Sequence, residues 1–227
     1  MSTTTTRIWD LPTRLFHWLL AVCVIALLAT AKIGGNAMEW HLRLGHVVLA
    51  LLAFRLAWGL VGGHWSRFAT FIPGPARLAR YLRGAGSPAD HMGHSPLGAL
   101  SVIALLLVLM VQVGTGLVSD DEIAFAGPLS RRVSADTVAW ATQWHQGWGQ
   151  WLLLALLGLH LGAIAFYAVV RRRHLVPPMV HGNKPLPPGS TASRDSLATR
   201  LTALVLAALC AAAAWWVYSL GSAAPAF

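Results

Sequence analysis

Four histidines lie near the ends of long apolar segments of this chain, where an imidazole ring could bind a metal ion. They are His17, His41, His145 and His160. His145 and His160 share one segment, and the rise of an α-helix places residues 15 positions apart at a separation of roughly 22 Å. This separation puts one histidine near each face of the hydrocarbon core of a bilayer. Pairs of histidines at two depths are one way for a helical bundle to hold two planar metal cofactors.

Helix geometry predicts how the four histidines pair. Each residue turns a helix by about 100°, so the side chains of His145 and His160 differ in direction by roughly 60° and can face one interior. His17 has the predicted depth of His160, and His41 has the predicted depth of His145. The spacing therefore predicts two pairs, although a single histidine at the end of a span is usually an ordinary interfacial residue.

His46 competes with His41 for a place in the interior. Arg55, deep in the same segment, costs a few kcal/mol unless it faces the bundle or extends to the membrane surface. Its direction lies about 40° from that of His41 and roughly opposite to that of His46. We therefore predict an inward face formed by His41, Gly45 and Arg55, where Gly45 lets a flat cofactor approach the backbone.

The segments that position these residues are typical of membrane helices. Of the residues, 56% are hydrophobic and 11% are charged, and the mean hydropathy is +0.59, which excludes an ordinary soluble domain. Five stretches are long enough to cross a bilayer as helices. They are Leu15–Ala31, His41–Val61, Leu97–Val118, Trp148–Val170 and Leu201–Leu220. The sequence predicts an all-α membrane protein, with a four-helix transmembrane bundle and a fifth, C-terminal transmembrane helix.

The net charge of +9 is explained by membrane topology, and we expect no nucleic acid partner. Basic residues concentrate in the loops 62–96 and 171–200, which the positive-inside rule places in the cytoplasm together with the N-terminus. In the first of these loops, Pro75–Leu82 is predicted to form a short amphipathic helix. The loop 119–142 carries Asp120, Asp121 and Glu122, which could steer a basic partner or cap their own loop.

The first apolar segment also has features of a cleavable signal peptide, because Ala29-Thr30-Ala31 follows its apolar run. Cleavage would remove His17, so we keep this segment as a span. Cys23 and Cys210 lie inside spans and are expected to be buried thiols. The chain has no CxxCH motif for covalent haem attachment.

Several segments resemble the bacterial cytochrome b561 family, which includes the membrane subunits of nickel–iron hydrogenases. The resemblance rests on residues 9–18 (WDLPTRLFHW), 93–99 (GHSPLGA) and 121–125 (DEIAF), and on the spacing of His41, Gly45, Arg55 and Trp58-Gly59. It extends to Lys184. It implies a di-haem cytochrome b membrane domain of four spans at residues 1–184, followed by a linker and a C-terminal transmembrane anchor at residues 185–227.

The resemblance also implies two non-covalent b haems with bis-histidine ligation, in which His17, His41, His145 and His160 are the axial ligands of iron. The two histidines of the fourth span are commonly 14 positions apart in this family, and here they are 15 apart. We therefore expect a small adjustment of the helix near Gly147 or Gly149. Arg14 and Arg55 are expected to contact haem propionates.

Bis-histidine ligation fills both axial positions of the iron, which favours outer-sphere electron transfer over substrate activation. We expect an electron-transfer protein, or a subunit of an oxidoreductase complex, in the bacterial inner membrane. It would pass electrons between a quinone or quinol pool and a protein partner, either a periplasmic cytochrome c or a dehydrogenase- or hydrogenase-type subunit. Two alternatives stay open. The first is a histidine-relay transporter, for which interrupted helices and internal repeats are expected. The second is a membrane anchor without redox function, whose purified protein would show no haem colour.

Overall fold

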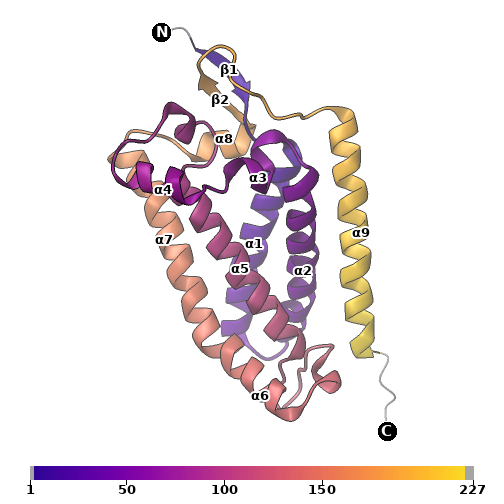
Figure 1. Cartoon of the computed structure of the whole chain (residues 1–227). Helices are drawn as coiled ribbons and strands as arrows, with labels where there is room; N and C mark the ends of the chain where they lie inside the picture. The colour runs from indigo at the N-terminus through magenta and orange to yellow at the C-terminus, as the bar shows by residue number, and fades with distance from the viewer. Residues whose placement is uncertain (1–2, 223–227) are drawn as a thin grey trace. The chain divides into compact units, whose positions relative to one another are not determined.

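The computed structural model of the chain describes residues 3–222 and is built mainly of helices (Figure 1). Within these residues, five helical segments are long and apolar enough to cross a membrane by length and composition. They are Leu11–Ile33, Ala37–Val61, Pro96–Val118, Ala135–Val169 and Leu197–Gly221. Each contains or closely overlaps one predicted span. The predicted all-α membrane fold with five spans is therefore confirmed.

The elements follow one another along the chain as labelled in Figure 1. The long helices are α1 (Leu11–Ile33), α2 (Ala37–Val61), α5 (Pro96–Val118), α7 (Gly149–Val169) and α9 (Leu197–Ser222). The short ones are α3 (Phe68–Phe71), α4 (Pro75–Leu82), α6 (Ala135–Gln143) and α8 (Val176–His181). Single turns of 3₁₀-helix form at η1 (His64–Ser66), η2 (Pro88–His91) and η3 (Ser130–Arg132), and the π-helical turn η4 (Trp144–Trp148) joins α6 to α7.

The short helix α4 has the predicted bounds, Pro75–Leu82. Proline is favoured at its first position because that residue needs no amide hydrogen there. The Arg77 Nε of this helix donates to Asp90 Oδ1 at 2.6 Å, and Asp90 Oδ2 accepts from the Ser87 amide at 2.8 Å. Burial alone raises the pKa of Asp90, but hydrogen bonds from Arg77 and Ser87 hold that pKa below its usual value.

The chain divides into two compact units, and both draw on the long helices. Of the described residues, the first unit contains 3–17, 55–104 and 156–206, and the second contains 18–54, 105–155 and 207–222. The predicted pair His17 and His160 falls in the first unit. The predicted pair His41 and His145 falls in the second. Each pair is therefore assembled from segments that are far apart in the sequence.

A buried carboxylate organises the first unit. Asp10 is fully buried, and its Oδ1 accepts hydrogen bonds from the Thr13 amide at 2.8 Å and from Trp58 Nε1 at 3.2 Å. Its Oδ2 accepts from the Ser66 hydroxyl at 2.8 Å and from the Gly63 amide at 3.2 Å. Asp10 thus caps the N-terminus of α1 and ties it to the segment that follows α2.

Two short antiparallel strands, β1 (Thr4–Arg7) and β2 (Asn183–Leu186), join the N-terminal residues to the segment between α8 and α9 (Figure 1). Thr4 pairs with Leu186, and Arg7 pairs with Asn183. Further along, the Ser193 hydroxyl donates to the carbonyl oxygen of Ile8 at 2.6 Å. The predicted domain boundary after Lys184 falls inside β2, and the division into a haem domain and an anchor stays a prediction.

In the second unit, the loop after α5 is closed by its own acidic residues. Asp121 Oδ1 accepts from the amides of Ile123, Ala124 and Phe125 at 3.0, 2.9 and 2.8 Å. These backbone hydrogen bonds, led by that of Phe125, lower the pKa of Asp121. The geometry supports the loop-capping interpretation of the acidic cluster, and a docking role for it stays a prediction.

Candidate functional site

The structure brings His41 of α2 and His145 of η4 together. Their ring centroids lie 6.0 Å apart, and the ring planes are at 89° to each other. Imidazole nitrogen binds first-row metal ions at about 2 Å, so two rings on opposite sides of one ion have centroids about 6 Å apart. Both side chains are half-buried. The separation therefore fits two axial ligands of one metal centre.

Helix α1 orients the ring of His41. The Nδ1 atom of His41 lies 3.0 Å from the carbonyl oxygen of Leu27 and 3.3 Å from the hydroxyl oxygen of Thr30. A carbonyl oxygen can only accept, so Nδ1 carries the hydrogen and donates it. The Nε2 lone pair is then available to a metal, which is the usual arrangement of a metal-binding histidine.

Helix α5 orients His145 in the same way. His145 Nδ1 donates to the backbone carbonyl of Gln112 at 2.8 Å, while Gln112 Nε2 donates to the carbonyl of His145 at 2.7 Å. The hydroxyl of Thr115 lies 3.5 Å from the same Nδ1. A methyl group added at Gly116 would lie 2.9 Å from His145 Cε1. The backbone of α5 therefore packs directly on the ring.

These residues of α5 were not among the predicted site residues, because the span Leu97–Val118 contains no histidine. The available signal was the cluster of polar and small residues Gln112, Thr115 and Gly116 inside an otherwise apolar segment. A polar side chain in a membrane span usually has a partner inside the protein. Such residues can therefore reveal where a ligand histidine is held.

The extra residue between His145 and His160 is absorbed by η4. In this π-helical turn the Gly149 amide donates to the carbonyl oxygen of Trp144, five residues earlier, and Gly147 has φ −107° and ψ −108°. A π-turn inserts one residue into an α-helix. Glycine tolerates this backbone conformation because it has no Cβ. The adjustment expected near Gly147 or Gly149 is therefore present, and its effect on the proposed haem site stays a prediction.

His41 and His46 point in different directions from α2. His46 Nδ1 donates to the carbonyl oxygen of Leu42 in its own helix at 2.6 Å, and its ring packs edge-on against Tyr218 of α9, with centroids 5.0 Å apart. At Gly45 an added Cβ would meet no atom within 4 Å, so there is open space beside the helix. The structure thus directs His41 toward His145, and directs His46 toward α9.

The other predicted pair lies in the first unit. His17 of α1 and His160 of α7 are both half-buried and lie close enough to influence each other electrostatically. Arg55 lies in the same unit and is only 3% exposed. Its guanidinium carbon is 4.7 Å from the ring centroid of Phe68 and 5.8 Å from that of Phe71. Arg55 therefore does not extend to the membrane surface, which was the alternative to an interior position.

His94, just before α5, is half-buried, and its Nδ1 atom is fully buried. Its ring centroid lies 4.6 Å from that of Trp9 and 4.5 Å from that of Phe71. Burial first, and then the charges of Arg55 and His17, lower the pKa of His94 to about 3, so the ring is neutral. Among the described residues, neither His94 Nδ1 nor Arg55 Nη1 has a hydrogen-bond partner.

The segment 93–99 carried part of the family resemblance, and that was the signal available for His94. Arg14, in contrast, donates from Nη1 to the carbonyl oxygen of Val180 at 2.6 Å, near the end of α8. Its expected contact with a propionate stays a prediction.

Within the described residues, no group of three or more His, Cys, Asp or Glu side chains is placed to hold a metal ion. An iron macrocycle needs only two axial ligands from the protein. The oriented pair of His41 and His145, on apolar helices of membrane length, therefore indicates the class: a helical membrane protein with a site suited to haem.

The comparison with known families agrees with this class. The sequence model of the family described as prokaryotic cytochrome b561 matches residues 8–182. The chain belongs to this family. It is therefore a multi-pass b-type cytochrome, which binds haem b and transfers electrons in a membrane.

Individual relatives are distant but align over most of their length. The chain is 24% identical to a protein of Azotobacter chroococcum mcd 1 named as a probable Ni/Fe-hydrogenase B-type cytochrome subunit, over 79% of this chain and 88% of the relative. The chain is 23% identical to the probable Ni/Fe-hydrogenase B-type cytochrome subunit of Cupriavidus necator, over 78% of this chain and 86% of the relative. It is 24% identical to the probable Ni/Fe-hydrogenase 1 B-type cytochrome subunit of Escherichia coli strain K12, over 68% of this chain and 80% of the relative. No solved structure gives a significant match.

Proposed function

We propose that the chain holds two non-covalent b haems, one between His41 and His145 and one between His17 and His160. The observation that supports this best is the orientation of the first pair. Both Nδ1 atoms donate to backbone carbonyls, and the ring centroids are 6.0 Å apart. The Nε2 atoms of His41 and His145 would then be available to hold the iron of a haem. When bound, each haem supplies an iron that accepts and releases one electron.

The residues around the histidines would set the geometry and the charge of each site. The hydrogen bonds to Leu27 and Gln112 raise the basicity of the ligand rings and fix their orientation. The space beside Gly45 would let a flat macrocycle approach α2. Two histidines would hold each haem, and the bound haem would supply one-electron transfer, which this ligation would favour over transformation of a substrate at the metal.

We further propose that Arg55 and His94 donate to a haem propionate in the first unit. Each has a buried nitrogen without a partner in the described residues, and both side chains contact Phe71. A buried donor left unpaired costs about 1–3 kcal/mol, so an anionic acceptor would be favourable here. Within the described residues, Arg14 Nε is also buried without a hydrogen-bond partner. We propose that it too donates to a haem propionate.

The proposed electron path runs between a membrane quinone or quinol pool and a protein partner. The names of the relatives refer to Ni/Fe-hydrogenase, which favours a hydrogenase- or dehydrogenase-type subunit as one partner. A periplasmic cytochrome c is the second candidate. The charge distribution of the loops favours a chain with its N-terminus in the cytoplasm of a bacterium.

Haem quantitation with reduced-minus-oxidised spectra tests this proposal. We expect two b haems per chain, extractable into acidified acetone, with low-spin spectra. Substitution of one ligand histidine by alanine should remove one haem, and His41→Ala should do so while His46→Ala leaves both. Arg55→Gln should keep both haems and lower one midpoint potential, because a nearby positive charge favours the reduced iron. One haem or none in the unaltered protein, expressed with ample haem, contradicts the proposal.

A further inference from the structure

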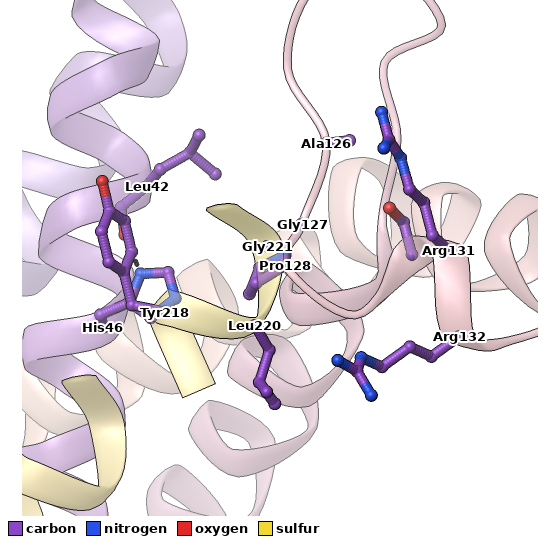
Figure 2. Close-up of a pocket in the computed structure, with 11 residues that line it drawn as sticks. Leu42, His46, Ala126, Gly127, Pro128, Arg131, Arg132, Tyr218, Leu220 and Gly221 are labelled. Carbon is purple, nitrogen blue, oxygen red and sulfur yellow. Dashed lines mark hydrogen bonds between the residues drawn. The ribbon is translucent and has the colours of Figure 1, made fainter. Parts of the chain in front are cut away.

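A pocket of about 380 Å³ lies in the second unit and contains none of the four paired histidines. Its volume is within the range of small-molecule sites. Its walls come from α2, from the loop between α5 and α6, and from the end of α9. The lining includes Leu42, Pro128, Ser130, Arg131, Arg132 and Tyr218 (Figure 2). The family match ends at residue 182, so the α9 wall is an addition to the matched region.

The polar groups of the lining are mainly hydrogen-bond donors. Arg131 and Arg132 bring two positive charges, and the hydroxyls of Ser130 and Tyr218 can each donate as well. The lining contains no carboxylate. In the described part of the chain, no salt bridge and no side-chain hydrogen bond engages either arginine. Two unpaired guanidinium groups at one pocket favour an anion with several acceptor oxygens.

His46 also lines the pocket but does not change this preference. Its Nδ1 donates to its own helix, and its ring packs against Tyr218, so the Nε2 acceptor is buried. Figure 2 shows His46 and Tyr218 together on one side of the pocket and the two arginines on the other. A ligand therefore meets the donors and not the imidazole acceptor.

The remaining lining is apolar and belongs to helices of membrane length. Leu42 lies in α2 and Leu220 in α9, and both helices are long and apolar enough to cross a bilayer. Ala126 and Pro128 add apolar surface from the loop. A ligand with an anionic head and an apolar chain would match both parts of the lining, because basic residues beside a span attract anionic lipid head groups.

We propose that this pocket binds the phosphate group of an anionic phospholipid, with Arg131 and Arg132 as its main contacts. The lipid would fill the space between α2, the loop after α5 and α9, and would stabilise the packing of the appended helix. The inference is independent of the haem sites, because it uses none of their residues. It predicts selectivity for an anionic phospholipid over a zwitterionic one.

Lipid retention in detergent tests the proposal. The full-length holoprotein, purified from membranes, is analysed for bound phospholipid by mass spectrometry, and binding of added phosphatidylglycerol is compared with that of phosphatidylcholine. We expect about one retained anionic phospholipid per chain and little phosphatidylcholine. In Arg131→Gln/Arg132→Gln the affinity for phosphatidylglycerol should fall roughly tenfold or more, with haem content unchanged.

The matched control is Arg171→Gln/Arg172→Gln, a second pair of adjacent exposed arginines, which should bind the lipid as the unaltered protein does. The substitution Ala126→Phe should narrow the pocket and so weaken binding of phosphatidylglycerol, although it removes no charge. Equal loss in both arginine variants would overturn the proposal, since it would indicate a general charge effect. So would inorganic phosphate that displaces the lipid at millimolar concentration, or a bound quinone in place of a phospholipid.

Discussion

At the scale of single residues, the site depends on which nitrogen of each histidine is free. In His41 and His145 the Nδ1 atom donates to a backbone carbonyl of a neighbouring helix. This contact sets the tautomer, holds the ring plane and leaves the Nε2 lone pair available for the proposed bond to iron. The carbonyls belong to Leu27 and Gln112, whose side chains have no role in this contact. The orientation of a ligand ring is therefore achieved by main-chain groups, which no residue type reveals.

Gly116 offers the sharpest test of this arrangement. A Cβ at this position would lie 2.9 Å from His145 Cε1, closer than real contacts allow, so Gly116→Ala should displace the ring. We expect the haem content to fall from two toward one per chain. Gly114→Ala in the same helix is the control, because a Cβ there meets nothing within 4 Å. The result would contradict the packing described here if both variants kept two haems with unchanged spectra.

At the scale of elements, η4 shows how a helix absorbs an additional residue. Its π-helical turn places the irregular backbone at Gly147 and leaves α7 regular from Gly149 onward. The local cost of the turn is modest because glycine stands at the irregular position. His145, the proposed ligand, lies inside the turn, so the backbone of the turn sets the direction of its ring.

Two single-residue deletions test whether η4 absorbs the additional residue or whether only the number of residues between His145 and His160 matters. Deletion of Gly147 should convert η4 into regular α-helix and retain both haems. Deletion of Ala155, within regular α7, should shift the helix register by about 100° and lose one haem. Both variants have a spacing of 14 positions between His145 and His160. Equal haem content in the two proteins, measured after purification, would show that η4 does not absorb the extra residue.

The start of α1 is a second element whose geometry is testable. Asp10→Ala removes the acceptor for the Thr13 and Gly63 amides, Trp58 Nε1 and the Ser66 hydroxyl. Loss of a helix cap and of several buried hydrogen bonds should lower the free energy of unfolding by roughly 3 kcal/mol.

Denaturant titration in detergent measures the change, and Asp136→Ala, an exposed acidic residue in the first turn of α6, is the matched control. A loss at Asp10 no larger than that at Asp136 would mean that the buried network contributes little.

At the scale of the whole molecule, five candidate spans and the proposed cytoplasmic N-terminus together predict the side of the membrane on which the C-terminus lies. An odd number of crossings puts the C-terminus on the opposite side, so a reporter fused after Phe227, which lies outside the described residues, should report a location outside the cytoplasm. A reporter inserted after Gly189, in the basic loop before α9, should report the cytoplasm. Cytoplasmic activity of the C-terminal fusion would instead indicate signal cleavage, a different number of spans or inverted topology.

Much of the architecture could be predicted because hydrophobicity in a membrane protein is a nearly local property. A stretch of about 20 apolar residues has few stable alternatives to a helix in lipid, where every backbone hydrogen bond must be made within the segment. The five spans follow from this rule, whereas the short helix Pro75–Leu82 follows from its amphipathic pattern. The predicted directions of His41 and Arg55 rest on the helical angle, because both are on one uninterrupted helix, α2, and their shared inward face stays a prediction.

The contacts that complete the sites depend on the tertiary structure. Gln112, Thr115 and Gly116 are 29 to 33 positions from His145 in the sequence, and their role depends on how α5 packs against η4. His94 lies in the loop before α5, where packing against Trp9 and Phe71 leaves its ring half-buried and its Nδ1 atom fully buried. Helical periodicity determines which way a side chain points from its own helix. Packing between segments distant in the sequence determines which backbone carbonyl or aromatic ring the side chain then contacts. The local sequence pattern does not predict this packing.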